Sequence, residues 1–352
     1  MVFKGSVQVV VYNGAVRASG VSSVGCGRRA GPSAGARRGG RRESHPVTPG
    51  FAPLRCTDHL LFSLEGPLPP DHPELLRYLR REVLVPPAAG PYNLLGRRNA
   101  ALLKVEKSEV FYNETLRRLL ADKRGGFFVE AGALDGESMS NTLWLERERG
   151  WTGLLVEADH AAFLALRDKR RKAWAANVCL APTPYPARML FRQSSHAPGP
   201  LSKPLGFKLR SMNGLAQYTN NQIMGDSWFQ RVQCVALESL LMALGVRRVD
   251  LLVLDVEGAE QAILDHLDLD KFNVQVLCLE WKKQAEQQGL VDDLAQRGFQ
   301  LVARLREDLV LVRRGSEYAT RLTTTTTPLP QGTHSAITSQ NSAITSRNKI
   351  FR

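Results

Sequence analysis

Two apolar runs in the middle of the chain end in acidic residues and enclose a loop of small residues. The run FFV is followed by Glu130 and by a loop that contains Gly132 and Gly136, and the run LLV is followed by Glu157. In a doubly wound sheet, glycines after one strand let a ligand approach the backbone, and an acid after the next strand binds ribose hydroxyls. The spacing therefore predicts a binding site for a nucleoside.

The charge of this loop favours S-adenosylmethionine over a dinucleotide. A dinucleotide-binding loop carries three glycines in G-x-G-x-x-G spacing, whereas three residues separate Gly132 from Gly136. The carboxylates of Glu130 and Asp135 flank the loop, and they would repel a pyrophosphate but suit an ammonium and a sulfonium. A turn that binds nothing is the alternative that the glycine spacing leaves open.

A second group of carboxylates follows two later apolar runs. Asp255 ends the run LLVL, Glu257 and Glu260 lie just beyond it, and Glu280 ends the run VLCL. Because the carboxyl ends of parallel strands meet at one edge of a sheet, we expect these acids to lie close together. Such a cluster could take the proton of a hydroxyl that accepts a methyl group, or bind a divalent cation. For Glu260, a cap or a salt bridge on its own helix is the simpler interpretation.

Apolar runs alternate with helical patterns from residue 126 onward, which indicates a parallel sheet covered by helices. The last two runs flank Arg306–Asp308 and indicate a hairpin. Five crossover strands followed by an antiparallel hairpin form the seven-stranded, Rossmann-like sheet of class I methyltransferases, an α/β fold. The expected strands are 127–131, 153–157, 174–180, 251–255, 274–280, 299–305 and 309–314, and two of the expected helices are 138–149 and 236–245.

Composition divides the chain into one domain and two tails. The net charge is +13, but residues 1–55 contribute +8 of it, so the excess is mostly a property of one tail and predicts no specific nucleic-acid binding. Tails of low complexity are typical of disorder. We expect a disordered basic tail at 1–69, a folded domain at 70–316 with a helical lead-in at 70–124 and an insertion or lid at 181–232, and a disordered Thr/Ser-rich tail at 317–352.

The five cysteines include no C-x-x-C, and no histidine pair has ligand spacing, so no metal site is assigned. Cys278 lies in an apolar run and is expected in the core. Cys179 and Cys234 could pair in an oxidising compartment, with free thiols in a reducing one as the alternative. No apolar run approaches the roughly 18 residues of a membrane span. The chain as written is therefore expected to be soluble and cytoplasmic.

Several motifs resemble the FkbM-type methyltransferase family. They are FFVEAGALDGESMSNT, LLVEAD, VDLLVLDVEGAE and VLCLEW, and the DVEGAE box at Asp255–Glu260 is the most specific of them. The segments DHPELLRYLR, PPAAGPYNLL and SNTLWLERERGWTGLL are similar to the animal Star-like branch. The resemblance covers roughly residues 70–316. It implies a class I fold, S-adenosylmethionine as cofactor and O-methylation of an acceptor that the sequence does not identify.

The resemblance also implies roles for individual residues. Cofactor binding is expected from Glu130, Gly132, Ala133, Asp135, Gly136, Glu157, Ala158 and Asp159, and chemistry from Asp255, Glu257 and Glu280. The Star-like similarity implies a second function, a non-catalytic protein that acts through protein partners in ER–Golgi–endosome trafficking of signalling proteins. Star-like proteins usually carry a membrane-spanning segment before the domain. If the amino terminus is incomplete, this similarity places the protein on secretory-pathway membranes.

Overall fold

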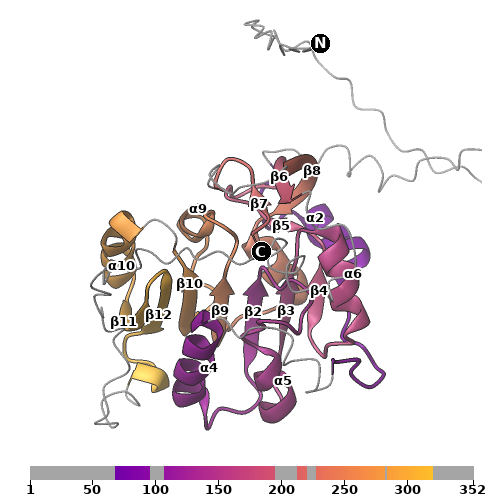
Figure 1. The fold of residues 1–352 in the computed structure, drawn as a ribbon. Coiled ribbons are helices and arrows are strands. Elements are labelled where there is room, and N and C mark those ends of the chain that lie inside the picture. Colours follow the sequence, from indigo (N-terminus) through magenta and orange to yellow (C-terminus); the bar gives the residue numbers. More distant parts are fainter. Residues whose placement is uncertain (1–67, 96–106, 195–211, 220–226, 282–283, 320–352) are drawn as a thin grey trace, which may run out of the picture. The chain divides into compact units, whose positions relative to one another are not determined.

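The computed structural model describes residues 68–95, 107–194, 212–219, 227–281 and 284–319. Their main feature is an eight-stranded sheet in the order β1-β4-β3-β2-β9-β10-β12-β11 (Figure 1). The strands from β4 to β10 run parallel, and β12 and β11 close one edge as an antiparallel hairpin. The predicted fold class is confirmed. These strands are β2 (Phe127–Ala131), β3 (Thr152–Val156), β4 (Trp174–Ala176), β9 (Leu251–Leu254), β10 (Val276–Glu280), β11 (Phe299–Leu305) and β12 (Asp308–Arg313).

Helices cover both faces of this sheet because successive strand residues point to opposite sides. Val129 and Leu252 belong to one hydrophobic cluster, and Phe128 and Val253 belong to another. The first cluster includes residues of α2 (Pro73–Tyr78), α8 (Leu237–Leu244), α9 (Glu260–Asp265) and α10 (Gln287–Gln296). The second includes residues of α4 (Lys107–Leu120), α5 (Leu143–Arg149) and α6 (His160–Asp168). A short 3-10 turn, η2 (Gln284–Glu286), precedes α10.

The expectation of seven strands was wrong by one, because the amino-terminal lead-in contributes β1 (Leu84–Val85). Helix α2 continues into one turn of π-helix, η1 (Leu79–Val83), and the chain then extends along β4. Leu84 is buried in the same cluster as α2, which explains why the strand stays at this edge. A two-residue strand is too short to produce an alternating pattern, so only the helical part of the lead-in was visible in the sequence.

The segment after β4 forms a second, four-stranded sheet in the order β5-β8-β6-β7. Its strands are β5 (Cys179–Leu180), β6 (Ala187–Ser194), β7 (Gly214–Leu215) and β8 (Ser227–Val235). The single strand expected at 174–180 was wrong, because the chain leaves the large sheet between β4 and β5. Asn177 marks this change of sheet, since its side-chain amide donates to the carbonyl oxygen of Glu157 at 2.8 Å. In Figure 1 the small sheet lies above the carboxyl ends of β2, β3 and β9.

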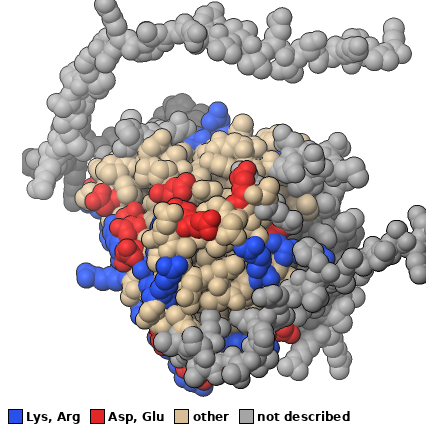
Figure 2. Space-filling view, turned by 90° about the vertical axis from the view of Figure 1, so that its left-hand side faces the viewer, with Lys and Arg blue, Asp and Glu red and all other residues tan. Residues whose placement is uncertain are grey.

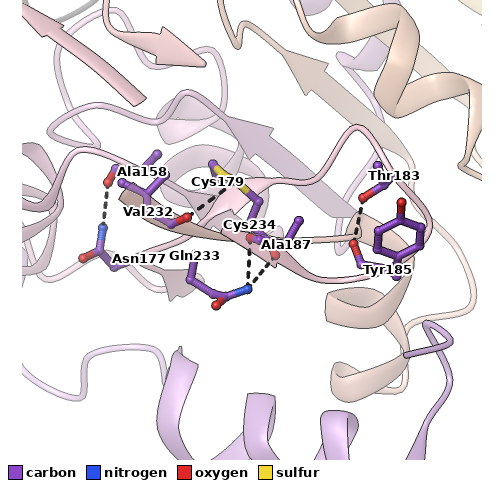
Figure 3. Close-up of a disulfide and its surroundings, with 9 residues drawn as sticks. All are labelled: Ala158, Asn177, Cys179, Thr183, Tyr185, Ala187, Val232, Gln233 and Cys234. Carbon is purple, nitrogen blue, oxygen red and sulfur yellow. Dashed lines mark hydrogen bonds between the residues drawn. A yellow bond between two sulfur atoms is a disulfide. The ribbon is translucent and has the colours of Figure 1, made fainter. Parts of the chain in front are cut away.

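A disulfide joins Cys179 to Cys234, which face each other on the parallel strands β5 and β8 (Figure 3). Their Cα atoms are 4.4 Å apart, and both residues are buried. The bond connects the two points at which the small sheet begins and ends. Cys278 is a fully buried free thiol, as expected from its apolar run.

The two ends of the chain, residues 1–67 and 320–352, contain most of the predicted tails and lie outside the described residues. Within the expected tail, Tyr318 and Ala319 are buried. Tyr318 is fully buried, and its hydroxyl is 3.2 Å from Asp250 Oδ1. The ordered part of the domain thus includes at least three residues beyond 316.

The disulfide gives a stability prediction. It closes a loop with a sequence separation of 55 residues. Replacing both Cys179 and Cys234 by alanine should therefore lower the free energy of unfolding by about 4 kcal/mol, because the unfolded chain regains loop entropy. Urea unfolding measures the loss. Reductant should lower the stability of the wild type by a similar amount and leave the double variant unchanged. An equal response of both proteins to reductant would contradict the assignment.

Candidate functional site

A cavity opens at the carboxyl ends of β2, β3 and β9, beneath the small sheet. The loop after β2 lines one side with Gly132, Ala133 and Leu134. Glu157 and Ala158, which follow β3, line a second side. Phe191 and Leu215 belong to the small sheet and add an apolar wall together with Val178 and Leu180. The cavity therefore has a polar backbone-lined side and an apolar side.

Gly132 holds the loop in place by a close backbone approach. Its φ is +83°, and a Cβ there would overlap the carbonyl oxygen of Asp255 at the end of β9. The amides of Gly132 and Ala133 donate to the carbonyl oxygen of Val156 in β3, at 3.0 and 3.1 Å. The start of the loop is thus fixed to the strands on both sides of β2, and only glycine fits at position 132.

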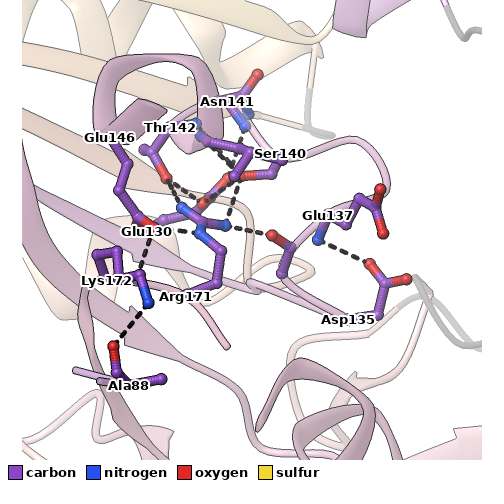
Figure 4. A network of polar contacts seen from close by, with 12 residues as sticks. Ala88, Glu130, Asp135, Glu137, Ser140, Asn141, Thr142, Glu146, Arg171 and Lys172 are labelled. Atoms are coloured by element: carbon purple, nitrogen blue, oxygen red, sulfur yellow. Dashed lines mark hydrogen bonds and ion pairs between the residues drawn. The ribbon is translucent and has the colours of Figure 1, made fainter. Parts of the chain in front are cut away.

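Glu130 lines the cavity, but its carboxylate is bound by the far end of the same loop (Figure 4). It accepts from the hydroxyl of Ser140 at 2.9 Å, the amide of Asn141 at 2.7 Å and the hydroxyl of Thr142 at 2.6 Å. These bonds hold residues 138–142 in an irregular path. Helix α5 consequently begins at Leu143, and the helix expected to begin at 138 starts later.

Asp135 and Gly136 are held within the loop and do not line the cavity. Asp135 Oδ1 accepts from the amides of Glu137 and Ser138, at 3.0 and 2.7 Å. Gly136 has a φ of +73°, and a Cβ there would lie 3.0 Å from Leu166 of α6. Both residues shape the turn without lining the cavity. Asp135 does so as in an Asx turn, which the sequence pattern does not distinguish from ligand binding.

Glu157 is buried at the wall of the cavity between two backbone donors. Its carboxylate accepts from the amide of Leu134 through Oε2 and from the amide of Asp159 through Oε1, each at 2.7 Å. Burial raises the pKa of Glu157 to about 8, with a smaller contribution from the charge of Asp159, and the two amides act in the opposite direction. At neutral pH much of this carboxyl is therefore protonated in the protein without ligand.

Asp159 connects helix α6 to the small sheet. Its Oδ1 caps the helix by accepting from the amides of Ala161 and Ala162, at 2.8 and 3.1 Å. Its Oδ2 accepts from the side-chain amide of Asn213 at 2.8 Å. Asn213 lines the cavity, whereas Asp159 does not. The sequence pointed to Asp159 and missed Asn213, because the residues around Asn213 have no periodic pattern.

Asp255, Glu257 and Glu280 come together beside the cavity, and one carboxylate oxygen of each lies within 4.8 Å of the others. Asp255 is exposed and lines the cavity, Glu257 is buried with a φ of +65°, and Glu280 is half-buried at the end of β10. The predicted meeting of these acids at one sheet edge is therefore present. Their spacing suits proton transfer or a divalent cation.

Glu260 fixes the loop that carries Glu257. Its Oε1 accepts from the amides of Val256 and Gly258, at 3.0 and 3.1 Å. The residue is 1% exposed, and burial raises the pKa of its carboxyl. Glu260 therefore binds the loop that precedes α9, and it is not the cap or salt bridge on its own helix that the simpler interpretation expected.

The segment that forms this sheet edge matches a known protein family. The model of the methyltransferase FkbM domain matches residues 130–307, about half of the chain. The chain belongs to the FkbM methyltransferase family. The matched segment begins at Glu130 and includes both the glycine loop and the acidic cluster. The FkbM assignment agrees with the resemblance carried by the sequence motifs.

Solved structures and curated proteins add little to this assignment. Two similar structures are a human methyltransferase 10 domain containing protein and the METTL16 MTase domain, each with 13% identity and a TM-score of 0.31. The first similarity covers 60% of this chain and 83% of the other, and the second covers 68% and 80%. No curated protein matches this chain.

One face of the FkbM domain carries side chains of both charges (Figure 2). Figure 2 shows acidic and basic side chains interspersed on the face toward α10 and the β11 edge. None of the helices in the described ranges is long and apolar enough to cross a bilayer.

The backbone approach at Gly132 can be tested against a matched glycine. Gly298 has a similar φ of +85°, but nothing lies within 4 Å of a Cβ placed there. Gly298→Ala should cost on the order of 1 kcal/mol for the backbone conformation alone. Gly132→Ala should cost clearly more, because its methyl group must displace the end of β9. Equal losses in urea unfolding would show that the two backbones do not approach as described.

Proposed function

We propose that this FkbM domain is an S-adenosylmethionine-dependent O-methyltransferase. The observation that carries the proposal is the cavity at the carboxyl ends of β2 and β3, which is lined by the Gly132 loop and by Glu157. Ligands of open α/β sheets bind at this edge, where the strand order reverses. Here β2 is flanked by β3 and β9, so the reversal lies at the cavity.

The residues present suit this cofactor. Because Gly132 has no side chain, the loop backbone can lie against the end of β9. In this position the loop lines the cavity, where it would face the methionine part of the ligand. Glu157 would accept hydrogen bonds from the ribose hydroxyls. The apolar wall of Val178, Leu180 and Phe191 would cover the adenine ring. When bound, S-adenosylmethionine supplies an electrophilic methyl group on a sulfonium.

The chain's own contribution to the chemistry is to place the acceptor and receive its proton. Asp255 is the exposed member of the acidic cluster and lines the cavity, so its carboxylate can reach a hydroxyl in the site. Glu257 and Glu280 lie close enough to influence its charge. A hydroxyl acceptor fits this arrangement because it must lose a proton as it is methylated.

A second function follows from the Star-like similarity, namely a non-catalytic protein of the secretory pathway. The Cys179–Cys234 disulfide favours it, because structural disulfides persist in oxidising compartments and are rare in reducing ones. Both functions are compatible with cofactor binding. Methyl transfer to any acceptor would separate them.

Asp255→Asn tests the proposed base. The change keeps the size of the side chain and removes its ability to hold a proton, so turnover should fall by about 10²-fold or more while cofactor affinity changes little. Isothermal titration and a methyl-transfer assay measure the two quantities. Undiminished turnover in the folded variant would remove Asp255 from the mechanism.

Glu157 should make cofactor affinity depend on pH. The ribose hydroxyls need the ionised carboxylate, and its pKa of about 8 means that this form becomes dominant only as the pH rises. Between pH 6.5 and 8.5 the affinity of the wild type should therefore increase by about 20-fold from this group. The ligand's own titration is common to wild type and Glu157→Gln, so the variant is the control and should lack this increase. Parallel pH profiles would contradict the role of Glu157.

A further inference from the structure

Arg171 is a buried cation between α6 and β4 that the sequence did not single out. It is 3% exposed, and its Nε lies 3.0 Å from Oε2 of Glu146 on α5. The side chains of this ion pair are 2% and 1% exposed. The other oxygen of Glu146 accepts from the amide of Lys172 at 2.6 Å. The guanidinium is thereby held in one orientation behind α5.

The remaining donors of Arg171 reach the cavity loop from behind (Figure 4). Its Nη1 donates to the carbonyl oxygen of Gly136 and to Ser140 Oγ at 3.3 Å, and its Nη2 donates to Thr142 Oγ1 at 3.2 Å. These three acceptors belong to the middle and the end of the loop. Glu130 binds only the end of the loop, whereas Arg171 binds both its middle and its end.

The hydroxyls of Ser140 and Thr142 connect Arg171 to Glu130, and each of these hydrogen bonds can run in only one direction. Ser140 and Thr142 each donate their hydroxyl hydrogen to Glu130 Oε2. Having one hydrogen each, they can only accept from Arg171. The buried guanidinium of Arg171 therefore faces two buried carboxylates, that of Glu146 directly and that of Glu130 through the two hydroxyls. A neutral side chain at position 171 would leave both carboxylates without this charge.

The loop itself is strained and needs such support. Leu134 and Met139 have φ values of +51° and +57°, which cost free energy for residues with a Cβ and persist only when their surroundings fix them. Both residues line the cavity, together with Ser140 and Asn141. Arg171 is not part of the lining. Of its three acceptor residues, Gly136 and Thr142 also lie outside the lining, and Ser140 is part of it.

We infer that Arg171 is a positioning residue that fixes the cavity loop, residues 132–142, in its binding geometry before a ligand arrives. A loop ordered in advance spares the ligand the entropic cost of ordering it. The identity of the ligand rests on the proposed function, but the ordering of the loop does not. Arginine suits the task because its planar fork directs several donors at once, which the ammonium of lysine cannot reproduce.

Arg171→Lys tests the inference, with Arg313→Lys as the matched control. Arg313 also uses its fork on backbone carbonyls, those of Val274 and Leu269, at 2.6 and 2.8 Å. It lies where β10 begins, at the opposite end of the sheet from Glu280. Arg171→Lys should weaken S-adenosylmethionine affinity by at least about tenfold, and the control by less than about twofold.

Hydrogen exchange of the ligand-free protein gives a second readout. The amides of Leu134 and Asn141 bond to Glu157 and Glu130, so they report on the order of the loop. In Arg171→Lys they should exchange at least about tenfold faster, while the amides of β9 stay protected. If the wild type binds no S-adenosylmethionine, the proposed function fails and this exchange alone decides the inference.

A variant that keeps the buried ion pair covers the case in which Arg171→Lys does not fold. Thr142→Val removes one hydroxyl link at nearly constant shape, and Thr142→Ser retains the hydroxyl. The valine variant should show the faster exchange at Asn141, and the serine variant should restore the wild-type rate. Unchanged exchange in a folded Arg171→Lys or in Thr142→Val, or equal loss of affinity in Arg171→Lys and Arg313→Lys, would overturn the inference.

Discussion

The close approach of the loop after β2 to the end of β9 is the constraint on which the site depends. Because Gly132 has no Cβ, its backbone can lie against the carbonyl group of Asp255 while its amide bonds to β3. This single contact brings the glycine loop of the cavity and the acidic cluster to one place. A larger residue at position 132 would push the loop away from the end of β9, because hydrogen bonds keep β2 paired with β3 and β9.

Buried carboxylates serve two different purposes around this contact. Glu130, Asp135 and Glu260 use their oxygens on backbone amides or on hydroxyls of nearby loops, and so they determine where the backbone runs. Asp255 instead is exposed to the cavity. Glu157 combines both roles, because it bonds two amides and still lines the wall. Its raised pKa is the electrostatic consequence of doing so in a buried place.

The sequence predicted the large sheet well because each buried strand is a continuous apolar run that ends in an acid or small residue. It predicted the edge at which Asp255, Glu257 and Glu280 meet for the same reason. It could not show which way a carboxylate points. Asp135 lies in the glycine loop, where a ligand-binding residue is expected. Its Oδ1 instead accepts from two amides of the loop, and its Oδ2 accepts from the hydroxyl of Ser138. The direction in which a carboxylate points depends on the local backbone geometry, which the spacing of residues in the sequence does not show.

An insertion was expected at 181–232, but its organisation as a second sheet was not predicted, because its strands belong together only through long-range contacts. The disulfide joins two of its own strands, β5 and β8. The bond from Asn213 to Asp159 and the close approach of Gly258 to Tyr218 connect the small sheet to loops of the large sheet at two separate points. A Cβ on Gly258 would lie 2.6 Å from the carbonyl oxygen of Tyr218, so these two backbones also approach closely, although less closely than those of Gly132 and Asp255. The small sheet therefore forms a wall of the cavity in its own right. Because the small sheet contacts Asp159 after β3 and Gly258 in the acidic loop, a shift of this sheet would move both sides of the cavity together.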